Sequence, residues 1–182
     1  MAERRFGFTI AFIVFILDQL TKWIVTGPLG IRQLGDQLYV LPIFNLTFTE
    51  NRGISLGLLT ASSDLARWLL VALTAAIAAG VAVWIGREKE RGDQLALGLV
   101  LGGALGNILD RARFGYVVDF ADLHFTFWPQ AMCWSYSEGS CRPFLIFNVA
   151  DAAISIGVAT LLVRAFLSRK DADAPEEYQD HA

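Results

Sequence analysis

Residues 95–114 read LALGLVLGGALGNILDRARF, an apolar stretch with glycine at four positions and charged residues gathered near its end. A helix that crosses a bilayer needs about 20 mostly apolar residues, and this stretch has that length if neighbouring protein shelters its polar end. Small residues let membrane helices approach closely, because lipid supplies no hydrophobic drive for their association. The stretch therefore predicts a spanning helix in close contact with its neighbours. The alternative is that its glycines have no role in helix–helix contact.

Three further apolar stretches, residues 6–25, 65–85 and 144–167, also have the length of a span. Of the 182 residues, 54% are hydrophobic and 18% charged, and the mean hydropathy is +0.46. Soluble domains contain about 25% charged residues. We therefore predict an all-α membrane protein with four transmembrane helices, forming one domain over residues 1–170. The acidic, polar tail, 171–182, is expected to be disordered.

The positions of Lys and Arg predict the orientation of the spans, because short cytoplasmic loops are enriched in both residues. With four spans, the basic residues before the first, between the second and third, and after the fourth lie on one side. They are Arg4, Arg5, Arg87, Lys89, Arg91, Arg164, Arg169 and Lys170. Both termini are therefore expected in the cytoplasm, with loops 27–63 and 115–143 outside. The first stretch is too long for the core of a cleaved signal peptide and is expected to be retained.

Both predicted outer loops have sequence patterns that indicate structure. In residues 44–49 apolar side chains alternate with Asn and Thr, which predicts a half-buried strand in a small sheet on the membrane surface. The long segment 121–146 is rich in aromatic residues, which favour the headgroup zone of a bilayer. It also contains the two cysteines of the chain, Cys133 and Cys141. On the oxidising side of the membrane we expect them to form a disulfide.

Ionisable residues inside apolar spans are costly, about 2.5–3.5 kcal/mol each on insertion scales, and by default they indicate function. Asp18 and Lys22 in the first span are four residues apart, so they share a helix face and can pair. With the N-terminus inside, a rise of about 1.5 Å per residue places Asp18 in the outer half of the membrane. A structural ion pair that anchors the helix is the alternative, and the two roles are compatible.

Two further carboxyl groups are predicted at the same outer depth. The end of the third span presents three polar residues on one face, Asn107, Asp110 and Arg111. Asp119 follows among apolar neighbours, which raise the pKa of a carboxyl group by desolvation. Asn148 and Asp151 share a face at the start of the fourth span. Asp119 and Asp151 are therefore expected to come from neighbouring helices at the same outer depth, where they can meet.

Two carboxyl groups in contact share a proton and titrate as a coupled pair. One then activates a water molecule as general base while its protonated partner polarises a carbonyl group, which needs neither a metal nor a nucleophilic side chain. Arg111 is always charged and can hold a carboxylate or a substrate carbonyl. Asp119 and Asp151 are thus a candidate catalytic pair. The alternative is that the two are separate structural residues.

Other functional classes have less support in the sequence. It contains no basic stripe with interleaved aromatic residues, which a nucleic-acid partner would require. Two cysteines and two histidines without an HExxH motif indicate no zinc site, and no cofactor is expected. GISLG at 53–57 matches the nucleophile-elbow pattern around Ser55, but neither an α/β sheet nor a partner histidine accompanies it. A small proton-relaying transporter and a non-catalytic membrane assembly factor remain as alternatives.

Several motifs occur in order along the chain. They are DQLTK at 18–22, NLT at 45–47, ENRG at 50–53, GGALGN at 102–107, DR at 110–111, GYVVDF at 115–120 and FNVAD at 147–151. With these motifs, nearly the whole chain resembles the bacterial prolipoprotein signal peptidases, also called type II signal peptidases. The resemblance implies an intramembrane aspartic endopeptidase with four helices and a small extracytoplasmic sheet, the β-cradle. Such an enzyme removes the signal peptide of a diacylglyceryl-modified prolipoprotein just before the lipidated cysteine.

The resemblance also implies roles for individual residues. Asp119 and Asp151 match the catalytic pair, and the polar lining and helix motifs match Asp18, Lys22, Asn51, Gly106, Asn107, Arg111 and Asn148. It implies the bacterial inner membrane, an active site near the periplasmic face, and lipidated prolipoprotein and membrane lipids as partners. The sequence does not indicate an oligomeric state, and a monomer is taken as the default. The segment between the two acids is longer than expected for the family. Arg52 stands where family members often have a smaller residue, and no role is assigned to it.

Overall fold

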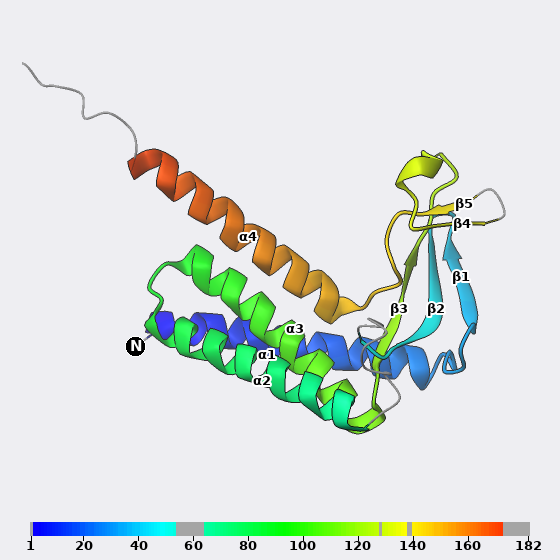
Figure 1. The fold of residues 1–182 in the computed structure, drawn as a ribbon, viewed down its shortest axis with the longest axis horizontal. Helices are drawn as coiled ribbons and strands as arrows, with labels where there is room; N and C mark the ends of the chain where they lie inside the picture. Colours follow the sequence, from blue (N-terminus) through cyan, green and yellow to red (C-terminus); the bar gives the residue numbers. More distant parts are fainter. Residues whose placement is uncertain (1, 54–63, 128, 138–139, 173–182) are drawn as a thin grey trace, which may run out of the picture.

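The computed structural model describes residues 2–53, 64–127, 129–137 and 140–172. A bundle of long helices has a three-stranded antiparallel sheet at one end (Figure 1). The helices are α1 (Ala2–Thr26), α2 (Asp64–Arg87), α3 (Arg91–Phe114) and α4 (Val149–Ala172). The sheet contains β1 (Gln37–Leu41), β2 (Phe44–Asn51) and β3 (Val117–Leu123). A short 3-10 helix, η1 (Gln130–Met132), precedes a hairpin of β4 (Ser135–Ser137) and β5 (Ser140–Arg142).

Four helices in the described part of the chain are long and apolar enough to cross a membrane. The predicted fold class, four spans with a small sheet, is confirmed. Several predicted boundaries differ from the structure: α1 begins at Ala2 rather than at residue 6, and α3 begins at Arg91 rather than at 95. α4 covers Val149–Ala172 rather than 144–167. Of the predicted tail, residues 171 and 172 end α4, and 173–182 lie outside the described residues, as does Ser55.

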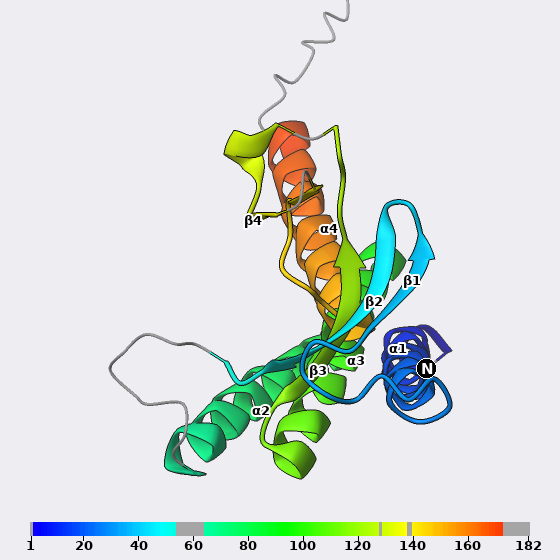
Figure 2. The ribbon, with the colours of Figure 1, turned by 90° about the vertical axis from the view of Figure 1, so that its right-hand side faces the viewer.

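α3 is the central helix and packs against α1, α2 and α4. Seen from the sheet end, it lies among the other three helices (Figure 2). Its glycines make this possible: a Cβ atom added at Gly98 would lie 2.5 Å from the carbonyl oxygen of Gly7. One added at Gly103 would lie 2.5 Å from the carbonyl oxygen of Ala150. The close packing predicted for the third span is confirmed.

Gly103→Ala should lower the free energy of unfolding by about 1–3 kcal/mol, the usual cost of overpacking. The added methyl group would collide with the backbone of α4 at Ala150. Gly80→Ala in α2 is the matched control, because nothing lies within 4 Å of a Cβ at that position. Alanine there should stabilise the helix by about 0.5–1 kcal/mol. Thermal unfolding in detergent measures the stability of both variants. Equal melting temperatures for the two would contradict the close approach of Gly103 to α4.

The sheet is packed onto the end of α1 through an apolar cluster. β2 is the middle strand and pairs antiparallel with β1 and β3. The buried members of the cluster are Val25, Ile31, Phe48, Val118, Phe120 and Ala121. The predicted strand at 44–49 is part of β2, but its alternation is interrupted by a register shift between Leu46 and Thr49. For this reason Phe48 is buried whereas Phe44 and Leu46 are only half-buried.

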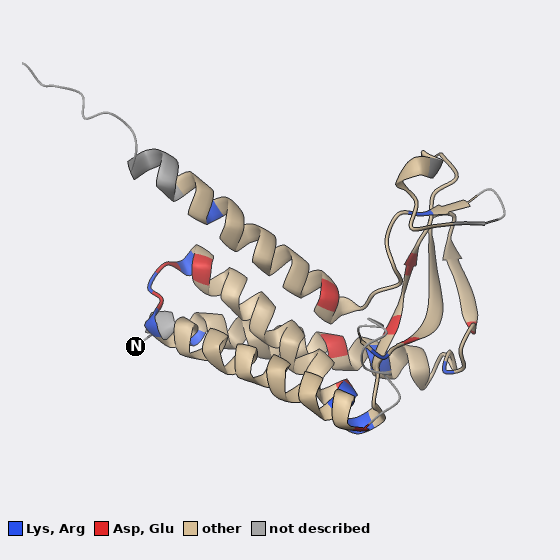
Figure 3. Cartoon of the chain, viewed as in Figure 1, with Lys and Arg blue, Asp and Glu red and all other residues tan. Residues whose placement is uncertain are grey.

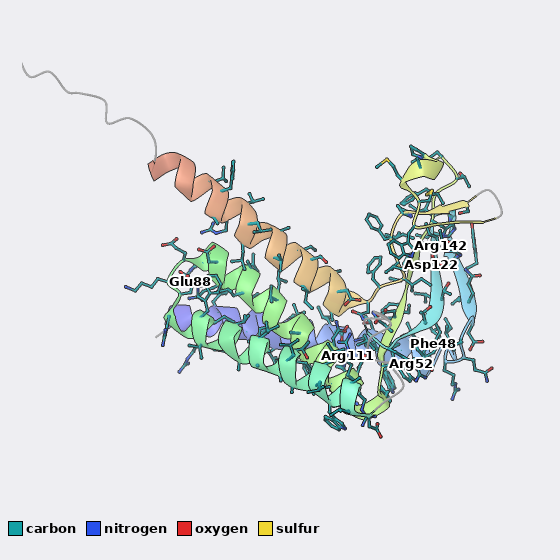
Figure 4. All side chains as sticks on the ribbon, viewed as in Figure 1. Phe48, Arg52, Glu88, Arg111, Asp122 and Arg142 are labelled. Atoms are coloured by element: carbon teal, nitrogen blue, oxygen red, sulfur yellow. A yellow bond between two sulfur atoms is a disulfide. The ribbon has the colours of Figure 1, made fainter. Side chains whose placement is uncertain are left out.

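The hairpin is fastened to the edge of the sheet formed by β3. Cys133 and Cys141 form a disulfide, and the backbone of Cys141 exchanges hydrogen bonds of 2.8 and 2.9 Å with that of Phe125. Arg142 Nε donates to the buried carboxylate of Asp122 at 2.8 Å. Figure 4 shows these two side chains together, well up the sheet and away from the helices. No sequence signal pointed to this pair, because its members lie on separate strands.

The two ends of the bundle differ in what they contain. The start of α1, the turn between α2 and α3, and the end of α4 lie at one end, and the sheet lies at the other (Figure 1). Lys and Arg gather at both ends, and the middle of the helices is almost free of them among the described residues (Figure 3). At the end away from the sheet, Arg164 pairs with Asp93. This distribution agrees with apolar spans between two polar surfaces.

Candidate active site

The two carboxyl groups of the candidate pair come from different elements that meet at the base of the sheet. Asp119 lies in the middle of β3, and Asp151 lies in the first turn of α4. Gly115 ends α3 with φ 85° and donates its N–H to the carbonyl of Arg111 at 3.1 Å. Glycine suits this position because other residues rarely adopt a positive φ. The chain can therefore turn at once into β3, a strand that the sequence analysis missed.

The segment that leads into α4 runs beside β3. The N–H groups of Phe120 and Ala121 donate to the carbonyl of Phe147 at 3.1 and 2.7 Å. Asn148 then caps α4: its Oδ1 accepts the N–H of Asp151 at 2.8 Å, and the Asp151 carboxylate accepts the N–H of Asn148 at 3.4 Å. This reciprocal capping box explains why α4 begins where it does. It also fixes the Asp151 side chain.

Amide side chains connect the two carboxyl groups. Asn148 Nδ2 donates to Asp119 Oδ1 at 2.7 Å and to Asn107 Oδ1 at 3.3 Å. Asn107 Nδ2, from α3, donates to Asp151 Oδ1 at 2.8 Å. Asn51, at the end of β2, makes a further side-chain hydrogen bond to Asp119. The structure thus brings these sequence-predicted site residues into one hydrogen-bonded group.

The surroundings of Asp119 raise the pKa of its carboxyl group. Burial raises the pKa of Asp119 to about 7, repulsion from Asp151 adds to the rise, and the amides of Asn51 and Asn148 oppose it. Arg111 is within electrostatic range of both carboxyl groups. It lies at the junction of helices and sheet (Figure 4), and its buried Nε has no hydrogen-bond partner in the described part of the chain. A carboxyl pKa near neutrality suits proton exchange at physiological pH.

A buried ion cluster lies next to the acid pair. Lys22 Nζ is 2.8 Å from Asp18 Oδ2 and 2.8 Å from Asp110 Oδ2. It also donates to Asn107 Oδ1 at 3.3 Å, which links the cluster to the acid pair. Asp18 and Lys22 pair as their spacing predicts. Asp110 was expected only to share a face with Asn107 and Arg111, and it proves to be the second carboxylate of this cluster.

The ion cluster also fastens the elements that carry the two acids. Asp18 Oδ1 accepts the N–H of Ala150 at 3.0 Å, at the start of α4. Asp110 Oδ2 accepts the N–H of Val118 at 3.2 Å, beside Asp119 in β3. A Cβ atom at Gly106 would collide with the Asp18 carboxylate, so glycine is needed for this approach of α1 to α3. Asp18, Lys22 and Gly106 therefore position the site rather than line it.

An apolar groove of ≈ 350 Å³ borders Asp151. Its walls come from α4 and from the segment before it, and include Phe144, Leu145, Phe147 and Ile156. Ile156 is 59% exposed on a helix that is apolar enough to span a membrane. The groove therefore offers apolar groups a path along α4 to the acid pair.

A family model described as signal peptidase (SPase) II matches residues 10–167. The chain belongs to the signal peptidase II family. It is 54% identical to the lipoprotein signal peptidase of Sphingopyxis alaskensis, over 90% of this chain and 86% of the relative. It is 38% identical to the lipoprotein signal peptidase of Caulobacter vibrioides, over 91% and 89% of the two chains.

Solved structures agree with this membership. A bacterial membrane enzyme solved by the in meso method shares 30% identity and superposes with a TM-score of 0.69, over 87% of this chain and 91% of that one. A second gives 28% identity and a TM-score of 0.71, over 95% and 94%. Signal peptidase II enzymes are proteases of the bacterial inner membrane, so membership identifies this chain as a membrane protease. It decides against the transporter and assembly-factor alternatives.

In this signal peptidase II member, the sequence analysis missed one residue at the core of the site. Gln19 Nε2 donates to Asp18 Oδ2 at 3.1 Å and to Asp110 Oδ1 at 3.0 Å. The signal was present, because a polar residue beside an ionisable one within an apolar span seldom lacks a partner. Gln19 closes the ion cluster by giving each carboxylate a neutral donor in addition to Lys22.

Proposed function

We propose that the chain is an aspartic endopeptidase that removes the signal peptide from diacylglyceryl-modified prolipoproteins by cutting just before the lipidated cysteine. The observation that carries the proposal is that the carboxyl groups of Asp119 and Asp151 are linked by hydrogen bonds through two amide side chains, those of Asn148 and Asn107. The raised pKa of Asp119 supports the same assignment. The relatives described above are lipoprotein signal peptidases, which supports the substrate class.

In the proposed reaction the pair shares one proton. Asp119, whose pKa of about 7 lets it hold that proton, donates a hydrogen bond to the scissile carbonyl. Asp151, in the first turn of α4, is the general base and takes a proton from the attacking water. The carbonyl oxygen gains the proton of Asp119 as the tetrahedral intermediate forms. On collapse that proton returns to Asp119, and Asp151 protonates the leaving amine.

Arg111 and the apolar groove have separate roles in this reaction. The Arg111 guanidinium, close to both acids, offsets negative charge as the carbonyl oxygen is polarised. The groove beside Asp151 accommodates apolar groups of a substrate that arrives from the lipid. Acyl chains on the substrate raise its local concentration at the site and help to fix its register. Specificity then needs no large recognition surface.

We further propose that both termini are cytoplasmic and that the site lies near the periplasmic face. The start of α1, the end of α4 and the turn between α2 and α3 lie at one end of the bundle (Figure 1). That turn contains Arg87, Lys89 and Arg91, as the positive-inside rule expects of a cytoplasmic loop. The disulfide between Cys133 and Cys141, at the sheet end, fits an oxidising compartment. We take the enzyme to act as a monomer.

A lipidated precursor peptide tests the substrate assignment. The purified protein should cut it directly before the modified cysteine. The same peptide without the diacylglyceryl group should be cut at least about 100-fold more slowly, because the lipid would no longer contribute binding energy in the transition state. Mass spectrometry of the products gives the cleavage position, and initial rates give the ratio. Equal rates on the two peptides would refute the lipid-anchored substrate.

Cleavage should weaken as the pH rises through about 7. Below that pH Asp119 keeps its proton, and above it Asp119 loses the proton that the scissile carbonyl needs, so kcat/KM should fall about tenfold per pH unit. Asn51→Leu removes a hydrogen bond that lowers the pKa of Asp119 and should move the descending limb to higher pH. Glu50→Gln, on the same strand and paired with Arg52, is the control and should leave the limb in place. A profile that is flat to pH 9 would contradict the shared proton.

A further inference from the structure

A cavity of ≈ 200 Å³ lies where the ends of α1 and α3 meet β2 and β3. Its charged lining residues are Lys22, Arg32, Asp110 and Arg113. Neither Asp119 nor Asp151 lines it, so it is separate from the groove beside the acid pair. The proposed reaction leaves this cavity without a role.

The lining has uncompensated positive charge. Lys22 is committed to Asp18 and Asp110, which it contacts at 2.8 Å each. No carboxylate in the described part of the chain forms an ion pair with Arg32 or Arg113. Two guanidinium groups are therefore available to an anion in one cavity.

Two other arginines at the sheet end do form ion pairs. Arg52 is 2.6 Å from the Glu50 carboxylate, and Arg67 is 3.5 Å from that of Asp64. The carboxylate near Arg32 is Asp36, and its Oδ2 is occupied by the backbone N–H groups of residues 32 and 33, at 3.0 and 2.8 Å. Asp36 is within electrostatic range of Arg32, but the two form no ion pair in the described part of the chain, so the N–H groups of the Arg32 guanidinium remain available.

Aromatic rings place the cavity at the depth of lipid headgroups. Trp23 and Phe114 line it at the ends of two spans, and they are 61% and 49% exposed. Arg113 stacks over the Phe114 ring at 5.1 Å. Tryptophan and tyrosine side chains at span ends occupy the membrane interface, and Tyr116 also lines the cavity. The anion present at that depth in a bilayer is the lipid phosphate, which arginine binds in a bidentate manner.

We propose that this cavity binds the phosphate of an anionic membrane lipid. Arg32 and Arg113 donate to the phosphate oxygens from the loop after α1 and from the last turn of α3. Trp23 and Phe114 contact the glycerol and the first acyl carbons. A lipid bound here would join the end of α1 to the end of α3, below the sheet that carries Asp119. The proposal does not depend on the peptidase mechanism.

The test compares lipids on the purified full-length protein in a neutral detergent. Short-chain phosphatidylglycerol should raise the melting temperature in a saturable manner, whereas phosphatidylcholine of the same chain length and inorganic phosphate at the same concentration should not. Arg32→Gln and Arg113→Gln should each weaken phosphatidylglycerol binding about fivefold, and the double variant about 25-fold. Arg87→Gln, an exposed arginine at the other end of the bundle, is the matched control.

Each outcome of this test supports the proposal or overturns it. An equal effect of phosphatidylcholine would show that only the apolar walls bind, and an equal effect of inorganic phosphate would show a site for the free ion. Either result overturns the proposal, as would wild-type affinity in the double variant. Native mass spectrometry of retained lipid gives a second measurement. If the double variant unfolds, two other measurements still test the proposal. One is the comparison of lipids on the wild-type protein, and the other is phosphatidylglycerol binding by the Arg32→Lys/Arg113→Lys variant, which retains both charges.

Discussion

Asp119→Asn and Asp151→Asn should each abolish cleavage of a lipidated precursor, lowering kcat by about 10²- to 10⁴-fold or more. An asparagine can keep most of the hydrogen bonds from Asn107 and Asn148, but it can neither accept the water proton nor return a proton to the carbonyl oxygen. The loss should therefore appear in kcat, with little change in the melting temperature. Initial rates on a lipidated peptide, together with thermal unfolding in detergent, measure both quantities.

A third carboxylate offers a matched control for this prediction. Asp122 lies three residues beyond Asp119 on the same strand and is equally buried, but its partners are Arg142 and Thr47. Asp122→Asn should loosen the hairpin and lower stability while most of the turnover remains. The dyad assignment is wrong if either Asp119→Asn or Asp151→Asn retains near-normal turnover, or if all three variants lose activity to the same degree.

Lys22→Met should destabilise the protein by about 3–5 kcal/mol, the usual cost of removing one partner of a buried ion pair. The variant would leave two buried carboxylates, Asp18 and Asp110, facing one another with no cation between them. Methionine fills a similar volume, so the effect reports the charge rather than a cavity. Because the cluster also fastens the start of α4 and the start of β3, turnover should fall together with stability.

Lys89→Met is the control, because Lys89 is exposed in the turn between α2 and α3 and the substitution should change stability by no more than about 0.5 kcal/mol. Removal of one of the two unpaired carboxylates should restore part of the stability that Lys22→Met loses. Lys22→Met with Asp110→Asn is expected to melt at a higher temperature than Lys22→Met alone. If Lys22→Met and Lys89→Met unfold at the same temperature, the cluster does not hold the fold together.

Much of the fold and of the site could be predicted from local patterns. Apolar stretches of span length identified the four helices, because a bilayer tolerates few charges over that length. Spacing of three or four residues identified pairs on one helix face, and both Asp18 with Lys22 and Asn148 with Asp151 are in contact. The two acids of the candidate site were selected by their place next to apolar segments and by the family resemblance.

The remaining features depend on where the chain goes after each helix, and spacing along the sequence does not contain that information. The start of α4 was predicted too early, because apolar residues 144–147 fit a span as well as they fit the extended segment that pairs with β3. The sharing of Lys22 between Asp18 and Asp110 requires α1 and α3 to lie side by side, which the glycines of α3 permit. The contact of Asn148 with Asp119 requires that β3 and the start of α4 be neighbours.

The sequence by itself thus determined which residues are polar in apolar surroundings and which of them share a helix face, because helix periodicity and the cost of burying charge in lipid act locally. Only the tertiary structure decided which polar groups from different elements meet. Hydrogen bonds and ion pairs form over about 3 Å, and the packing of helix against helix and strand against strand sets distances on that scale.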